Sequence, residues 1–242
     1  MSLPPFDMSL PDDFSGEARL FPLPNLVLFP NVVQALHIFE PRYCDMLEEA
    51  LATDRLITLA LLKPGWEQKY MGNPPLFDTV CIGKILTHSP TTDDRHNILL
   101  AGVKRARLKE EIVSPSAFRR ANVELLDDFY QPDQGTERLE LRQELMDSIS
   151  QSFDGNPDDS LSHLFSKQIP LGVLSDVIAF SSKLPLELKQ TLLEQTRVEC
   201  RCRILIRYLK QAHSQNTKEI PPVKETEKGN GSDRFPPPFS QN

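Results

Sequence analysis

The chain has 242 residues, of which 34 are acidic and 27 are Lys or Arg, so its formal charge is −7. This surplus of acid argues against a protein that binds nucleic acid or anionic membranes over its whole surface. The 21 prolines exceed the average composition, and eight of them lie in residues 1–19 and 214–242. We therefore expect disordered ends: a leader over residues 1–18 and a tail over residues 213–242.

The sequence shows no sign of export or membrane insertion. Its first residues are acidic and lack an apolar core, so no signal peptide is expected. No apolar run approaches the roughly 18 residues that a bilayer-spanning helix needs. The four cysteines are spread thinly along the chain, as is usual in a reducing compartment. These features predict a cytoplasmic protein with free thiols.

Residues 19–128 have the pattern of β-strands with one helix among them. The stretch 19–30 is apolar but interrupted by Pro22, Pro24 and Pro30, which predicts edge strands and turns. A helix is predicted at 40–54, because Pro41 suits a first helical position and apolar residues follow at helical spacing. That apolar stripe consists of Tyr43, Met46, Leu47, Ala50 and Leu51. Further strands are predicted at 32–39, 56–62, 79–88, 96–113 and 119–127.

After a turn at 131–135 the apolar period becomes helical, which predicts a bundle over residues 136–212. In its first helix Leu141, Leu145, Ile149 and Phe153 recur four residues apart. In its last helix one stripe holds Val198, Cys202, Leu205, Ile206 and Leu209. The predicted helices lie at 136–153, 160–167, 170–183, 185–195 and 196–213. The fold class is therefore α+β, a partly closed barrel followed by helices.

Several segments in this order resemble the N-terminal domain of Lon proteases. The first is LFPLPNLVLFPNVVQALHIFEPRY (20–43), and FDTVCIGKI (77–85) and LLAGVKRARLKE (99–110) follow. The last is DVIAFSSKLPLELKQTLLEQTRVECRCRILIRYLK (176–210). The resemblance covers about residues 19–210. It implies a PUA-like β-domain over residues 19–128, with the helical bundle after it.

The resemblance also implies a function, which is engagement of protein substrates without catalysis. Neither a phosphate-binding G-x-x-x-x-G-K-[ST] motif nor a Ser–Lys peptidase domain is found, so we expect no enzyme. Expected partners are protein or peptide segments, with a protease or ATPase among them, and an adaptor for unfolded or specific clients is one such role. The alternative is a PUA-like protein that binds nucleic acid or a small ligand.

No catalytic, cofactor or metal site is expected. Cys200 and Cys202 lie two apart on a predicted helix, so they point about 200° apart and cannot share a metal ion. We expect Cys202 in the core and Cys200 half-exposed. The five histidines are scattered, and none lies near a nucleophile motif. Glu40 and Arg42 are interpreted as a helix start, with Arg42 reaching back to a carboxylate, and the alternative is a polar contact at the edge of a cleft.

A basic run between residues 101 and 120 is the feature that favours RNA binding. Arg105, Arg107 and Lys109 share one face of a predicted strand, because side chains alternate. Phe118 is the only aromatic residue in this stretch, whereas RNA-binding sheets carry aromatics for base stacking. We therefore favour a solvated basic face that pairs with nearby glutamates.

The loop at 63–78 is the candidate protein-binding surface. It contains the only Trp of the chain, and its aromatic and Met residues fall outside any core periodicity. Such residues can grip extended apolar peptide when they are exposed. The candidate residues are Trp66, Tyr70, Met71 and Phe77. The alternative is that Trp66 and Phe77 cap the barrel.

Overall fold

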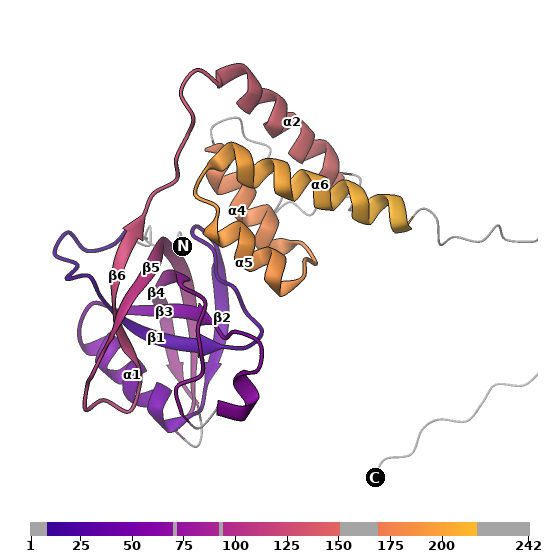
Figure 1. Ribbon diagram of the computed structural model, residues 1–242. Helices are drawn as coiled ribbons and strands as arrows, with labels where there is room; N and C mark the ends of the chain where they lie inside the picture. Colours follow the sequence, from indigo (N-terminus) through magenta and orange to yellow (C-terminus); the bar gives the residue numbers. More distant parts are fainter. Residues whose placement is uncertain (1–8, 70–71, 92–93, 151–168, 217–242) are drawn as a thin grey trace, which may run out of the picture.

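The computed structural model describes residues 9–69, 72–91, 94–150 and 169–216 (Figure 1). A twisted six-stranded sheet forms the lower part of the molecule in this view, and the helices that follow it in the chain lie above it. The strands are β1 (Glu17–Leu23), β2 (Val33–Ile38), β3 (Leu56–Leu61), β4 (Thr79–Pro90), β5 (His96–Ile112) and β6 (Arg120–Leu126). The helices are α1 (Pro41–Ala52), the short η1 (Trp66–Lys69), α2 (Gly135–Ser150), α4 (Leu171–Ser181), α5 (Leu186–Glu194) and α6 (Val198–Asn216). The α+β class is confirmed.

The sheet closes into a ring through its longest strand, β5. The strand order is β2-β5-β4-β3-β1-β6, and β6 pairs with β5 as well as with β1. The first part of β5, residues 96–101, pairs with β2, whereas residues 105–112 pair with β6. Only β1 and β3 run parallel among these pairs. The result is a barrel of five strands, with β2 added outside the ring as an edge strand.

Two apolar clusters lie on opposite faces of this sheet. One cluster takes alternate residues from all five strands of the ring, among them Leu20, Ala60, Ile82, Ala106 and Ala121, so it fills the barrel interior. The other cluster takes the intervening residues of β1, β3, β4 and β5 and packs them against α1 and the later helices. Strand β3 thus buries both faces, which explains its apolar sequence.

Helix α1 covers one side of the barrel, as its sequence predicts. Pro41 stands in its first turn, and Tyr43, Met46, Leu47 and Ala50 are buried. Glu49 fastens the helix to two strands. Its Oε1 accepts a hydrogen bond of 2.8 Å from Nε of Arg19, and its Oε2 pairs with Arg120.

The expectation that the first proline-rich stretch lies at a sheet edge is wrong for β1, which lies between β3 and β6. The backbone N–H of Leu20 donates to the carbonyl of Arg119, so the nitrogen of Pro22 faces the same side. The pairing of β1 with β6 has ended by then, at Arg19. Pro22 therefore occupies an inner strand without removing a ladder hydrogen bond.

Three expected boundaries differ from the structure. Leu10 and Phe14, within the expected leader, are partly buried and pack against the interior cluster. Strand β1 begins at Glu17, and α6 continues to Asn216, beyond the expected end of the bundle. The helix predicted at 160–167 and Phe153 lie outside the described residues.

Candidate functional site

The loop at 63–78 is held at its base as an extension of β3. The N–H of Lys63 donates to the carbonyl of Pro75, and the N–H of Phe77 donates to the carbonyl of Leu61. Trp66 begins η1 and packs half-buried against the barrel interior. Phe77 is also half-buried but packs against the other cluster, on the outer face of the sheet. The described aromatic residues of this loop therefore face different clusters.

The other two candidate residues of this loop, Tyr70 and Met71, lie outside the described residues. The candidate surface is thus placed only through Trp66 and Phe77. Phe77 also lies beneath a cation, since Nζ of Lys63 is 5.8 Å from its ring centroid.

A polar recess of about 280 Å³ lies beside this loop, between Asn73, Tyr43 and Arg119. Arg119 donates to the carbonyl of Pro74 at 2.8 Å and so fixes the loop to the start of β6. Arg42 donates to Oε2 of Glu40 at 2.8 Å, as the helix-start interpretation predicts.

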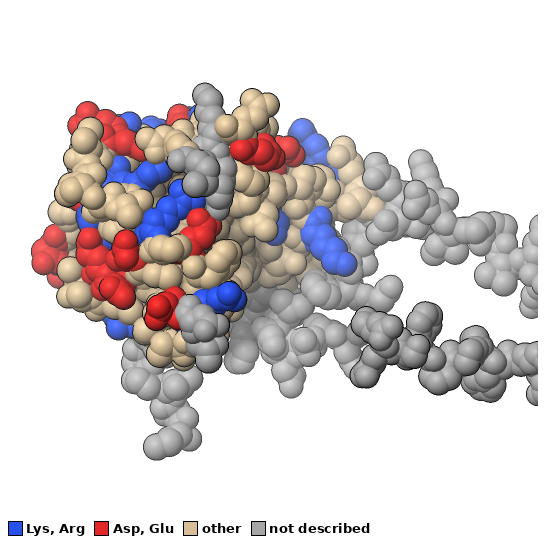
Figure 2. Space-filling model, turned by 90° about the horizontal axis from the view of Figure 1, so that it is seen from below, with Lys and Arg blue, Asp and Glu red and all other residues tan. Residues whose placement is uncertain are grey.

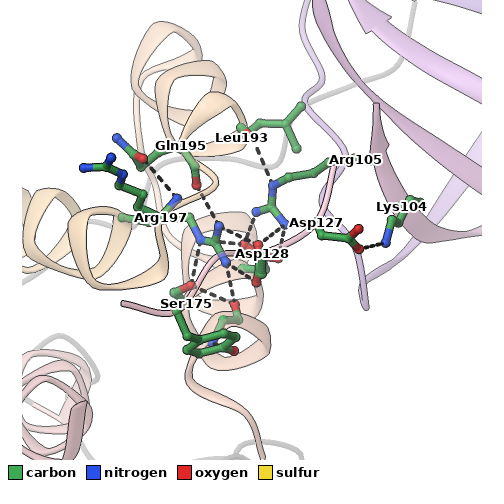
Figure 3. Close-up of polar contacts among 12 residues, drawn as sticks. Lys104, Arg105, Asp127, Asp128, Ser175, Leu193, Gln195 and Arg197 are labelled. Carbon is green, nitrogen blue, oxygen red and sulfur yellow. Dashed lines mark hydrogen bonds and ion pairs between the residues drawn. The ribbon is translucent and has the colours of Figure 1, made fainter. Parts of the chain in front are cut away.

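The helices are joined to the barrel by a buried ionic network (Figure 3). Arg105 of β5 is buried and donates from Nη1 to Oδ2 of Asp176 at 2.9 Å, while its Nη2 pairs with Oδ1. Its Nε donates to the carbonyl of Leu193 at the end of α5. One strand residue therefore holds both α4 and α5 against the sheet.

Arg201 of α6 completes this network from the helical side. Its side chain is fully buried and lies 3.2 Å from Asp176 through Nε. It also donates to Ser175, to the carbonyl of Gln195 and to Asp128, which follows β6. The two arginines thus share two carboxylates, Asp128 and Asp176, at the point where four segments meet.

Burial and charge act against each other in this network. Burial raises the pKa of the Asp176 carboxyl, and the guanidinium groups of Arg105 and Arg201 oppose that rise. Burial works to lower the pKa of Arg201, but Asp128 and Asp176 outweigh it and raise that pKa above its ordinary value. The charges compensate one another, which is the condition for burying them at all. The geometry is that of a structural joint, in which each carboxylate contacts both guanidinium groups.

The basic face predicted on β5 is divided by the helices. Arg105 does share a face with Arg107 and Lys109. It is buried, however, because α4 and α5 pack over that end of the strand. Arg107 and Lys109 stay exposed, and both pair with Glu124. Arg119 pairs with Glu111 in the same way.

Acidic and basic side chains are interspersed on the face shown in Figure 2, and neither sign dominates it. Together with the ion pairs of β5, this distribution leaves no broad cationic surface for a phosphate backbone on that face.

Cysteine and histidine side chains form no metal site among the residues that the structure describes. Cys202 is buried and Cys200 is half-exposed, as predicted. Sequence spacing did not indicate a histidine pair on the β4–β5 hairpin. Nε2 of His88 lies 3.0 Å from Nδ1 of His96.

Comparison with known proteins explains this architecture. Residues 17–211 match the family described as the ATP-dependent protease La (LON) substrate-binding domain. The chain belongs to this family. The match spans the barrel and the helices together, so both parts belong to one family domain.

Two longer proteins, both Lon proteases, are related to this chain in sequence. A Lon protease of Desulfosudis oleivorans is 26% identical over 203 residues, covering 82% of this chain and 24% of the relative. A Lon protease of Anaeromyxobacter dehalogenans is 22% identical over 200 residues, covering 82% of this chain and 23% of the relative. The chain spans about a quarter of the length of these relatives.

Solved structures of LON domains share the fold. The N-terminal domain of a Lon protease from the Mycobacterium avium complex has a TM-score of 0.63 at 16% identity, covering 80% of this chain and 98% of that one. A Lon N-terminal domain protein from Xanthomonas campestris has a TM-score of 0.55 at 19% identity, covering 79% and 98%. Within the described ranges, no helix combines the length and apolar character needed to cross a bilayer.

Sequence reasoning missed the ionic joint of this LON domain, although a signal for it existed. Asp176 interrupts the otherwise apolar run LGVLSDVIAF, and Arg201 lies next to the buried Cys202. A charged residue on the buried face of a helix almost always has a partner. The partner could not be named, because Asp128 and Arg105 lie on distant parts of the chain.

Proposed function

We propose that this LON domain is a non-catalytic recognition module that binds segments of client proteins in the cytoplasm, as an adaptor for unfolded or specific clients. The observation that carries the proposal is the match to a substrate-binding domain across residues 17–211. The fold supports the proposal, because the ion pairs of Arg105 and Arg201 fix the helices against the barrel, so that both parts can present a common binding surface. The four cysteines are free thiols, as is usual in a reducing compartment.

The loop at 63–78 is the first surface to test, with Trp66, Tyr70, Met71 and Phe77 as its proposed contacts. Burying one large aromatic side chain against a partner contributes about 2 kcal/mol or more, which is about a thirtyfold change in affinity. Because the loop at 63–78 lies beside the polar recess, a peptide bound there would have both apolar contacts and hydrogen-bond partners.

The test is binding of fluorescently labelled, unfolded casein to the purified chain, followed by fluorescence anisotropy. Wild-type protein should bind saturably, Trp66→Ala should bind more weakly, and Trp66→Phe should keep most of the affinity. Melting temperatures of the variants show whether the fold survives. Unchanged binding by folded Trp66→Ala would exclude this loop, and a wild-type chain that binds no casein would refute the proposed function.

A second assay addresses catalysis. The purified chain should neither hydrolyse ATP nor degrade casein in its presence. Turnover that survives removal of contaminating protease and is abolished by one point substitution would show an enzyme. Salt-dependent binding of single-stranded RNA without casein binding would favour the nucleic-acid alternative.

A further inference from the structure

Strand β2 leaves a row of backbone groups open at the edge of the sheet. Among the described strands it pairs only with β5. The N–H of Gly102 donates to the carbonyl of Val32 at 2.8 Å, so the backbone of Val32 faces β5. Because direction alternates along a strand, the N–H and C=O groups of Val33, Ala35 and His37 face away from it.

One of these outward groups, the carbonyl of Ala35, already accepts a hydrogen bond from a side chain. The side-chain amide of Gln34 turns back and donates to the carbonyl of Ala35 at 2.6 Å. The outward N–H groups of β2 receive no acceptor from the part of the chain that the structure describes. An edge of this kind is a template for another strand.

The side chains beside this edge are apolar or uncharged. Val33 is 47% exposed, Phe39 is 60% exposed and Leu99, opposite Ala35 on β5, is 38% exposed. Leu99 and Ala35 line a shallow groove of about 300 Å³ that continues to Thr87 on β4. At the next row, Nδ1 of His37 is 2.8 Å from Oδ1 of Asn97.

The usual protection of an edge strand is missing here. Natural edges carry Lys, Pro or inward-pointing charge, which discourage pairing with other chains. Residues 33–39 read VQALHIF and contain no Lys, Arg, Asp, Glu or Pro, although a quarter of the chain is charged. A neutral, apolar edge is complementary to a neutral, apolar strand.

We propose that β2 accepts an extended, uncharged segment of a client polypeptide as an added strand, with alternate apolar side chains against Val33, Ala35 and Leu99. The backbone of the segment supplies the affinity through hydrogen bonds to Val33, Ala35 and His37, and its alternate side chains supply selectivity. The segment must displace the Gln34 amide from the Ala35 carbonyl. This inference deepens the proposed function and rests on it, because it takes the occupant to be a client.

Proline at position 35 isolates the backbone contribution. The N–H of Ala35 faces outward, so Ala35→Pro removes one donor for the added strand and leaves the β2–β5 ladder intact. Ala35→Ser is the matched control, since it keeps the N–H with a side chain of similar size. Val33→Lys places a charge on the same edge and tests the site without altering the backbone.

The probe is a short fluorescent peptide in which valine and threonine alternate between terminal lysines. A second version carries an N-methyl group on every amide between the lysines, which removes its donors on both edges and keeps its side chains. Wild type and Ala35→Ser should bind the first peptide equally, and Ala35→Pro and Val33→Lys should bind it about fivefold or more weakly. The methylated peptide should bind wild type with a similar loss.

The other outcomes overturn either the inference or the proposed function. Equal binding by wild type and the two edge variants, with melting temperatures unchanged, would exclude β2. Equal binding of the methylated peptide would show apolar contact without strand addition. A concentration-dependent dimer in sedimentation that Ala35→Pro abolishes would assign the edge to a second copy. Casein binding that persists in the edge variants would reject β2 and leave the proposed function standing, whereas edge-dependent peptide binding without casein binding would do the reverse.

Discussion

The Arg201 guanidinium and the Asp128 carboxylate form a two-pronged ion pair, with Nη1 2.9 Å from Oδ1 and Nη2 2.7 Å from Oδ2. Arg201 belongs to α6, whereas Asp128 lies just after the last strand of the barrel. The fully buried Arg201 therefore ties the end of the sheet to the last helix. The residue after Asp128 is fixed as well, since the N–H of Phe129 donates to the carbonyl of Thr196.

Arg201→Met should destabilise the fold by about 3 kcal/mol or more, because it leaves the buried Asp176 carboxylate and the partly buried Asp128 carboxylate with one fewer cation. The free energy of unfolding in urea measures this loss. Arg203→Met on the same helix is the control. It removes an exposed pair with Glu137 and should cost less than about 1 kcal/mol. Equal losses in the two variants would contradict the structural role of the joint.

Gly172→Ala should loosen the same joint from α4. A Cβ atom at this position would lie 2.1 Å from Oδ2 of Asp128 and 2.9 Å from the Tyr130 hydroxyl. Since Arg201 holds that carboxylate, relief of the clash must break the ion pair, at a cost of about 1–3 kcal/mol. Gly135→Ala has open space around its Cβ and should be neutral or slightly stabilising. Thermal unfolding compares the two, and a Gly172→Ala protein as stable as Gly135→Ala would refute the close packing.

The His88–His96 pair should make stability depend on pH. Burial lowers the pKa of His88, and His96 and Arg55 lower it further. In the unfolded chain a histidine takes up a proton below about pH 6.5, whereas folded His88 resists protonation until a lower pH. The stability that neutral His88 contributes is therefore complete above the unfolded pKa and is lost as pH falls through the folded pKa.

The measurement is the free energy of urea unfolding between about pH 8 and pH 5. His88→Asn should flatten the decline toward acid, and His96→Asn should flatten it partly by removing one lowering influence. Parallel pH profiles for wild type and His88→Asn would show that this pair does not govern the acid response.

The four thiols should divide into two classes of reactivity. Burial raises the pKa of Cys81 to about 12 and that of Cys202 to about 12, so their reactive thiolates are scarce. Cys44 and Cys200 are half-exposed. Iodoacetamide at mildly alkaline pH should label the half-exposed pair in native protein and the buried pair only in urea, as peptide mass spectrometry would show. Labelling of Cys202 as fast as Cys200 would mean that α6 leaves the core readily.

The sequence by itself determined the order and type of most elements. The helical spacing of Tyr43, Met46 and Leu47 predicted the buried face of α1. The four-residue spacing of Leu141, Leu145 and Ile149 predicted that of α2, and the structure confirms both faces. Such patterns are readable because a strand or helix repeats its burial every few residues, within the range of local sequence. The resemblance of several segments in order also identified the family.

Only the tertiary structure decided which distant groups meet. Arg105 and Asp176 are 71 residues apart, and Asp128 and Arg201 are 73 apart, so no local pattern links them. Ring closure through β5 turned β1 into an inner strand and left β2 as the edge. Trp66 and Phe77, close in sequence, were assigned to opposite faces of the sheet. These outcomes follow from packing in three dimensions, because contact energy depends on which surfaces the folded chain brings together and sequence periodicity reports only which surfaces are apolar.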